Sequence, residues 1–107
     1  SQASISAPDD TPPLPAVFDA RTRWPTCYSI GGIRNQGNCG SCWAFAAAEA
    51  LADRACIAAG NITSALAVEY MVDCDRKNTG CEGGYLDDAW AFLRDTGVPV
   101  ETCDPYQ

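Results

Sequence analysis

The stretch that decides the fold is Gln36-Gly37-Asn38-Cys39-Gly40-Ser41-Cys42-Trp43-Ala44-Phe45. The run that follows continues to Arg54 without proline or glycine and is rich in alanine, so we expect a buried helix that begins at Cys42. Unpaired N–H groups at a helix N-terminus stabilise negative charge by roughly 0.3–1 kcal/mol. Because the thiolate is the reactive form of cysteine, and an ordinary thiol titrates near pH ~8.5, this position favours Cys42 as a nucleophile.

The pattern Cys39-Gly40-Ser41-Cys42-Trp43 matches the local signature C-G-[SA]-C-[WY] of papain and cathepsin active sites. The chain resembles the papain-like cysteine proteases from Leu14 to its C-terminus, and within them it is most similar to cathepsin B. The resemblance implies an endopeptidase or an exopeptidase that hydrolyses peptide bonds through a thioester acyl-enzyme, without a cofactor. It implies that Cys42 is the nucleophile, and that the side-chain amide of Gln36 and the N–H of Cys42 form the oxyanion hole.

The resemblance also assigns a substrate-binding surface. Gly40 allows the two oxyanion donors to approach each other, and Trp43 packs against the wall of the site. The segment Gly83-Gly84-Tyr85 matches the family strand whose glycine backbone pairs with the main chain of a peptide or protein substrate. Tyr85 would border the pocket for the second residue before the scissile bond. The alternative for this segment is a turn with a packed tyrosine.

The sequence contains no histidine. In this family the histidine that pairs with the cysteine lies about 130–150 residues further along the chain. The resemblance therefore implies that a second polypeptide supplies the catalytic histidine and its orienting asparagine, or that they are missing. We expect an α+β papain-like fold of two domains, of which residues 14–107 form the helical left-hand domain and the right-hand β domain is absent from this chain. Residues 1–13 would be an N-terminal extension or the remnant of a propeptide.

Seven cysteines in 107 residues indicate an oxidising compartment, and the odd number leaves one thiol unpaired. That thiol is naturally Cys42. Spacing does not fix the bonds among the other six. The resemblance implies two disulfides, Cys39–Cys81 and Cys27–Cys56.

Two cysteines then remain, Cys74 and Cys103. In cathepsin B and its nearer relatives the matching cysteines bond to cysteines further downstream, so we expect both to reach into sequence outside this chain, and the second polypeptide would then be disulfide-linked. The alternative is a bond between Cys74 and Cys103.

The sequence also bears on the compartment and on the partners. Asn61-Ile62-Thr63 is an N-glycosylation acceptor and agrees with passage through the secretory pathway. We expect a lysosomal or other acidic vacuolar location, or secretion. A formal charge of −7 argues against a nucleic-acid partner. No apolar run approaches the ~20 residues of a membrane span.

Other classes of protein account for parts of the pattern. Cys39 and Cys42 form a C-x-x-C before a helix, as in redox proteins, although the expected upstream strand is missing. A metal site is not expected, because a zinc set of Cys39, Cys42, Cys74 and Cys81 lacks the usual ligand spacing. A disulfide-rich structural domain and an inactive, protease-like binding module stay open as alternatives to an enzyme.

Two further helices are expected. One follows Ser64 as its cap and covers residues 65–73. The other runs from Leu86 to Asp95 and stops at Gly97, with Trp90 and Phe92 in the core or at an interface. The polar residues 75–80 between these helices predict a solvated loop.

Overall fold

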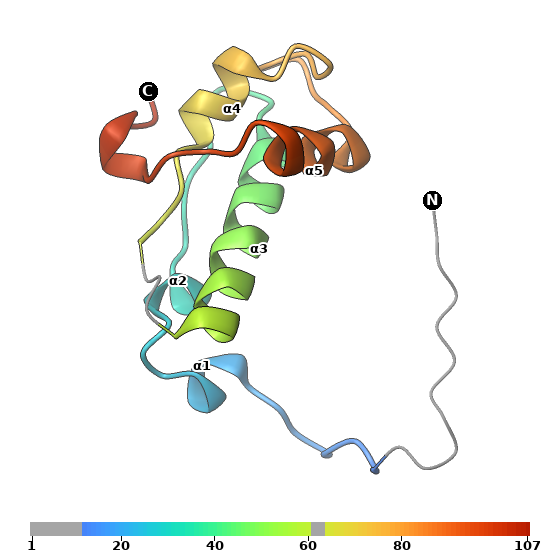
Figure 1. Ribbon diagram of the computed structural model, residues 1–107, viewed down its shortest axis with the longest axis vertical. Helices are drawn as coiled ribbons and strands as arrows, with labels where there is room; N and C mark the ends of the chain where they lie inside the picture. The colour runs from blue at the N-terminus through green and yellow to red at the C-terminus, as the bar shows by residue number, and fades with distance from the viewer. Residues whose placement is uncertain (1–11, 61–63) are drawn as a thin grey trace.

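The structure is a computed structural model that describes residues 12–60 and 64–107. Its elements are α1 (Ala20–Arg23), α2 (Tyr28–Gly31), α3 (Cys42–Ala59), α4 (Val68–Cys74), α5 (Leu86–Asp95) and a short 3₁₀ turn, η1 (Glu101–Cys103). The long helix α3 runs through the middle of the molecule (Figure 1). Helices α4 and α5 lie beside its N-terminal half, and α1 and α2 lie near its C-terminal end.

The core lies where α3, α4 and α5 meet. Small side chains on α3 let the other two helices approach it closely. Helix α5 has the bounds that its spacing predicts, although Leu86 at its start is 49% exposed. Trp90 and Phe92 are partly buried against this core, as expected. The buried residues of the cluster are Trp43, Ala44, Phe45, Ala47, Ala48, Val68, Met71, Ala89 and Leu93.

The start of α4 differs from the prediction. The helix begins at Val68, and the side chain of Ser64 does not cap it. Residues 65–67 are instead held by backbone pairing with residues 99–101. The N–H of Ala67 donates to the carbonyl of Pro99, and the N–H of Glu101 donates to the carbonyl of Ala65, both at 2.8 Å. This pairing between distant segments overrides the local preference of residues 65–67 for helix.

The polar loop after α4 is also not the solvated loop that its composition predicts. Asp75 is 4% exposed and Asn78 is 6% exposed, while Arg76 and Lys77 do face solvent. The side-chain amide of Asn78 donates to Asp75 Oδ2 at 2.7 Å, and its Oδ1 accepts from the N–H of Tyr85 at 2.6 Å. Burial of these two polar side chains is possible because each satisfies the other.

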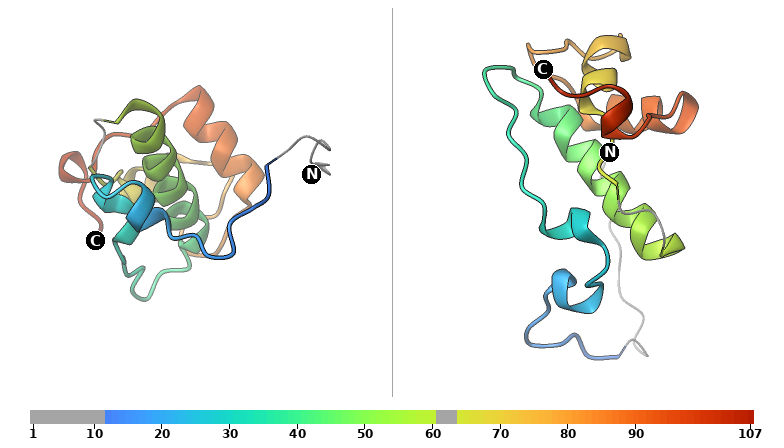
Figure 2. Two further views of the ribbon diagram at one scale, coloured as in Figure 1. Left: turned by 90° about the horizontal axis from the view of Figure 1, so that it is seen from below. Right: turned by 90° about the vertical axis from the view of Figure 1, so that its left-hand side faces the viewer.

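Two disulfides attach α3 to the rest of the chain, and they are the ones that the resemblance implies. Cys27–Cys56 joins the start of α2 to the last turns of α3, and Cys39–Cys81 joins the loop before α3 to the loop after α4. The extended segment that follows α2 lies alongside α3 and turns over at its N-terminus (Figure 2).

Three cysteines, Cys42, Cys74 and Cys103, are free and exposed. The structure therefore does not join Cys74 to Cys103. The expected glycosylation site at Asn61 and most of the expected N-terminal extension lie outside the described residues. Within residues 12–60 and 64–107, no helix combines the length and the apolar character that crossing a bilayer requires.

Candidate active site

Cys42 is the first residue of α3, and its thiol is free and exposed. Ser41 precedes it as the N-cap, but the Ser41 side chain makes no capping hydrogen bond. The Ser41 carbonyl accepts from the N–H groups of Ala44 and Phe45. In the described part of the chain nothing accepts from the N–H groups of Cys42 and Trp43. The thiol therefore lies beside unpaired donors that can face a negative charge.

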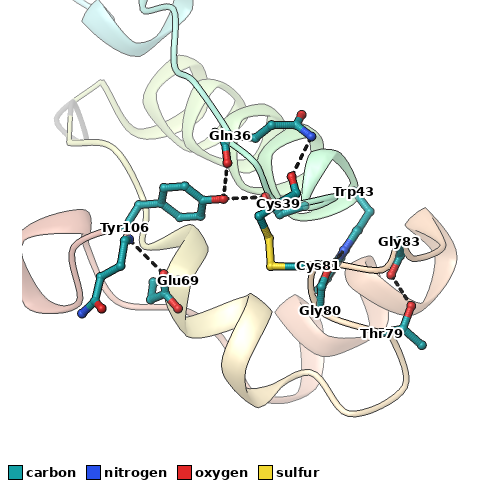
Figure 3. Close-up of a disulfide and its surroundings, with 11 residues drawn as sticks. Gln36, Cys39, Trp43, Glu69, Thr79, Gly80, Cys81, Gly83 and Tyr106 are labelled. Carbon is teal, nitrogen blue, oxygen red and sulfur yellow. Dashed lines mark hydrogen bonds between the residues drawn. A yellow bond between two sulfur atoms is a disulfide. The ribbon is translucent and has the colours of Figure 1, made fainter.

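Gln36 lies on the turn that leads into α3. Its Nε2 donates to the carbonyl oxygen of Cys39 at 2.8 Å, which fixes the orientation of the amide (Figure 3). A side-chain amide nitrogen carries two protons. One proton of Gln36 is used in this bond and the other is available to a ligand, so the geometry is compatible with the expected oxyanion role.

Gly40 lies where the loop before α3 touches the segment after the loop of Asp75. Its N–H donates to the carbonyl of Cys81 at 2.8 Å, next to the Cys39–Cys81 disulfide. A Cβ at Gly40 would lie 2.4 Å from that carbonyl oxygen. No side chain fits there without a backbone shift, so glycine is required for the two segments to lie side by side.

Trp43 directly follows Cys42, and its indole ring packs against the backbone of Gly84. The indole is 3% exposed, and its Nε1 donates to the carbonyl of Gly80 at 2.9 Å (Figure 3). A Cβ at Gly84 would lie 2.8 Å from the Trp43 ring and 2.7 Å from Asn78 Oδ1. The Gly84 backbone therefore packs directly on the indole.

The segment Gly83-Gly84-Tyr85 does not form the expected strand: Gly83 has a φ of 110°, and the described residues form only an isolated bridge beside it, between Gly40 and Glu82. Thr79 donates to the Gly83 carbonyl through its hydroxyl at 2.6 Å. No described residue hydrogen-bonds the N–H or C=O of Gly84. Such an unpaired backbone edge can accept an extended peptide.

Tyr85 is 77% exposed, so the alternative of a packed tyrosine is wrong. A hollow of about 260 Å³ lies beside the segment and combines backbone with both signs of charge. It is lined by Lys77, Asn78, Thr79, Glu82, Gly83, Gly84 and Tyr85.

Two contacts at the site were missed by sequence reasoning. One is the support of Tyr85 by Asn78, and the other involves Tyr106, whose hydroxyl donates to the backbone carbonyl of Gln36 at 2.5 Å. The same hydroxyl lies 2.8 Å from Ser41 Oγ. Tyr106 is 70 residues from Gln36 and 65 from Ser41, so no local pattern could have shown this contact.

The carboxylates of Glu69, Asp73 and Asp104 lie close together near the residue that follows Tyr106. The N–H of Gln107 donates to Glu69 Oε1 at 3.0 Å, and this bond lowers the pKa of Glu69. Partial burial and the nearby carboxylates of Asp73 and Asp104 act in the opposite direction, and the balance raises the pKa of Glu69 above its ordinary value. This end of α4 therefore takes up a proton more readily than an isolated glutamate.

The Cys39–Cys81 bond also decides between the alternatives for Cys42. With Cys39 bonded to Cys81, Cys42 has no partner for a C-x-x-C redox pair. The same bond removes two of the four sulfur atoms of the zinc set. What remains at the start of α3 is a single accessible thiol.

These features define a cysteine-protease type of site, and the family model described as "Papain family cysteine protease" matches residues 14–107. The chain belongs to the papain family of cysteine proteases. Within it the chain is cathepsin B-like. It is 54% identical over 86 residues to cathepsin B-like cysteine proteinase 4 of Caenorhabditis elegans, which covers 78% of this chain and 26% of that protein. It is 47% identical over 93 residues to cathepsin B of Dictyostelium discoideum, covering 87% of this chain and 30% of the relative.

Solved structures agree. Procathepsin B of Trypanosoma congolense superimposes with a TM-score of 0.87 at 27% identity, over 96% of this chain and 36% of that one. A cysteine protease of Carica candamarcensis, in complex with E-64, gives a TM-score of 0.76 at 31% identity, over 88% of this chain and 42% of that one. The chain thus has the helical left-hand domain of the papain-like fold, and it spans between a quarter and a third of the length of the two curated relatives.

Proposed function

We propose that this chain supplies the nucleophile, the oxyanion hole and a substrate-binding segment of a protease that hydrolyses peptide bonds. The observation that carries the proposal is the exposed thiol of Cys42, which lies beside its own unpaired N–H at the start of α3. The amide of Gln36 bonds to the carbonyl of Cys39, the backbone of Gly84 packs on Trp43, and the Cys39–Cys81 disulfide ties the two segments together.

The reaction follows from these groups. The thiolate of Cys42 attacks the carbonyl carbon of the scissile bond, and the oxygen that becomes negative accepts hydrogen bonds from the Cys42 N–H and the Gln36 amide. A histidine then protonates the leaving amine, which departs and leaves a thioester on Cys42. Water attacks the thioester, the acid product leaves, and the thiol is restored. The N–H and C=O of Gly84 would hold the main chain of the substrate during both steps.

The histidine and its orienting asparagine would come from sequence outside these 107 residues. This is supported by the absence of histidine from the chain and by the smaller length of the chain relative to its curated relatives. The exposed thiols of Cys74 and Cys103 are available for disulfides to that second part. The two disulfides within the chain fit formation in the oxidising secretory pathway, which leads to a lysosome, another acidic vacuole or the extracellular space.

The test uses the full-length protein, an epoxysuccinyl probe and a fluorogenic peptide. A peptide-like probe is needed because Cys42, Cys74 and Cys103 are all exposed, so exposure alone does not separate them. We expect the probe to label Cys42 and to stop turnover. Cys42→Ala should abolish labelling and turnover, while Ala46→Ser, an exposed change one turn along α3, should alter neither. Labelling at Cys74 or Cys103, or turnover that survives Cys42→Ala, would contradict the proposal.

The pH profile and the intact mass provide independent checks. In a cysteine–histidine mechanism kcat/KM rises at low pH as the thiolate–imidazolium pair forms, and it falls again when the imidazolium loses its proton. A profile that stays flat between about pH 4 and 8 would count against this mechanism. Intact mass before and after reduction would reveal a disulfide-linked second chain.

A second candidate function is an inactive, protease-like binding module, and the lack of histidine is the observation that favours it. Binding of a peptide by the full-length protein, with neither turnover nor probe labelling, would identify it.

A further inference from the structure

The hydroxyl of Tyr106 joins two parts of the candidate active site. It donates its only proton to the backbone carbonyl of Gln36 at 2.5 Å. Ser41 Oγ lies 2.8 Å from the same oxygen and therefore must donate to it. The result is a relay from Ser41 through Tyr106 to Gln36, which links the residue before the nucleophile to the residue that carries the side-chain oxyanion donor (Figure 3).

Several contacts fix Tyr106 in place. Its ring packs edge-on against Phe45 in the first turn of α3, with centroids 4.8 Å apart. Its N–H donates to Glu101 Oε2 at 2.8 Å. The other oxygen of Glu101 accepts from Arg34 Nη2 at 2.7 Å, and Arg34 also donates to the carbonyl of Leu66 at 3.0 Å.

The ion pair between Arg34 and Glu101 connects Tyr106 to the loop that carries Gln36. The two side chains are only 19% and 28% exposed, so solvent screens the pair less than it would at the surface. Arg34 lies two residues before Gln36 on the same loop. Tyr106 is therefore held to the loop of Gln36 in two ways. Its hydroxyl bonds to Gln36 directly, and its backbone N–H is connected to Arg34 through Glu101.

The relay has a consequence for the helix N-terminus. A serine at the N-cap normally accepts a hydrogen bond from a first-turn N–H through its hydroxyl. Ser41 is fully buried and its hydroxyl points to Tyr106 instead, so it does not cap α3. Such a cap bonds the second or third N–H of a helix, so the N–H of Trp43 is left without a partner in the described part of the chain. The N–H of Cys42, the first of the helix, is also unpaired there.

We infer that Tyr106 is a positioning residue of the oxyanion hole. Its hydroxyl holds the backbone of Gln36 at a fixed distance from the start of α3, and it fixes the orientation of the Ser41 side chain directly before Cys42. This inference rests on the proposed function. Oxyanion donors act through their placement before the reaction, so a small displacement of Gln36 relative to Cys42 slows the chemical step more than substrate binding.

The decisive variant is Tyr106→Phe in the full-length protein. It keeps the ring on Phe45 and removes only the hydroxyl. Because the change removes one hydrogen bond that holds Gln36, we expect kcat to fall about tenfold, with KM changed by less than about twofold. Tyr70→Phe is the matched control. Tyr70 is half-buried on α4 with its ring against Phe92, and it makes no contact with the loop of Gln36 that the structure shows, so its kcat should match that of the wild type.

Ser41→Ala tests the relay from its other end. It should also lower kcat, and the double variant with Tyr106→Phe should lose less than the sum of the two single changes in activation free energy, because both remove the same Ser41–Tyr106 bond. Additive losses would contradict a shared relay. A kcat for Tyr106→Phe equal to that of Tyr70→Phe, or a rise in KM that matches the fall in kcat, would overturn the inference.

The inference and the proposed function fail in different ways. If the wild-type protein does not turn over a peptide, the proposed function is wrong, and amide hydrogen exchange of residues 36–42 then tests the relay directly. Tyr106→Phe should speed exchange in this segment relative to Tyr70→Phe. Unchanged exchange would overturn the role of Tyr106 in holding the loop.

Discussion

Replacing Asn78 with alanine should destabilise the protein far more than its place in a polar loop suggests. The amide of Asn78 is 6% exposed and makes two short hydrogen bonds. It donates to Asp75 Oδ2 at 2.7 Å and accepts from the N–H of Tyr85 at 2.6 Å. The change therefore removes partners from two groups at once and frees the start of α5 together with the glycine segment before it.

The size of this loss of stability depends on which hydrogen-bond partners remain for Asp75 and for the N–H of Tyr85 once Asn78 is removed. Asp75 is 4% exposed, and after the change it keeps only a long contact with the N–H of Lys77 at 3.3 Å. The loss of a buried hydrogen bond to a charged group costs about 1.5–3 kcal/mol. The N–H of Tyr85 lies near solvent, so water replaces Asn78 there at a cost of about 1 kcal/mol. We expect a loss of about 3 kcal/mol in the free energy of unfolding.

Urea unfolding of the full-length protein, followed by tryptophan fluorescence, measures this loss. Thr79→Ala is the matched control, because it removes a hydrogen bond of 2.6 Å from the adjacent residue at an exposed position. Its cost should stay below about 1 kcal/mol. If the two variants lost equal stability, or if Asn78→Ala stayed within about 0.5 kcal/mol of the wild type, the reasoning about the buried amide would be refuted.

Three other predictions concern separate parts of the chain. Gln36→Ala should lower kcat by about 10²–10³-fold with a smaller change in KM, measured by steady-state peptide hydrolysis. Gly40→Ala should reduce the folded yield and the midpoint of unfolding, because its Cβ would lie 2.4 Å from the carbonyl oxygen of Cys81. Hydrogen bonds from the guanidinium and from the backbone N–H of Arg21 lower the pKa of Asp19 to about 2. The stabilisation from Asp19 is therefore present above its unfolded pKa and is lost as the pH falls toward 2; a carboxyl titration by NMR should show this midpoint, and Arg21→Ala should raise it.

The parts of the fold that follow from local sequence were predicted correctly. The start of α3 and the bounds of α5 follow from helix formers at regular spacing with no internal proline or glycine. The start of α4 could not be predicted in this way. Its first expected turn pairs with residues 99–101, and a contact over that distance leaves no trace in the composition of residues 65–67.

In the candidate site, too, the residues in a local stretch could be predicted, while those that depend on distant contacts could not. Cys42 and Gln36 lie in one short stretch, so their relation can be read from the sequence once the signature is known. Asn78 was read as part of a solvated loop because polar residues are usually exposed, and only the structure shows the buried carboxylate that pairs with it. Tyr106 had no signal at all, since its role depends on where the chain returns after 65 residues.

The two disulfides overlap along the chain, because Cys39 lies between Cys27 and Cys56 while Cys81 lies beyond both. During oxidative folding Cys39 must therefore form a bond across a sequence separation of 42 residues, although another thiol, Cys42, lies three positions away. Closing the short loop costs less chain entropy, so the wrong bond forms first unless α3 is already in place. A chain trapped in that form would contain its full complement of cysteines and still lack the free Cys42 thiol on which the proposed function depends. The order in which sulfur atoms are oxidised thus decides how much of the newly made protein keeps this thiol free.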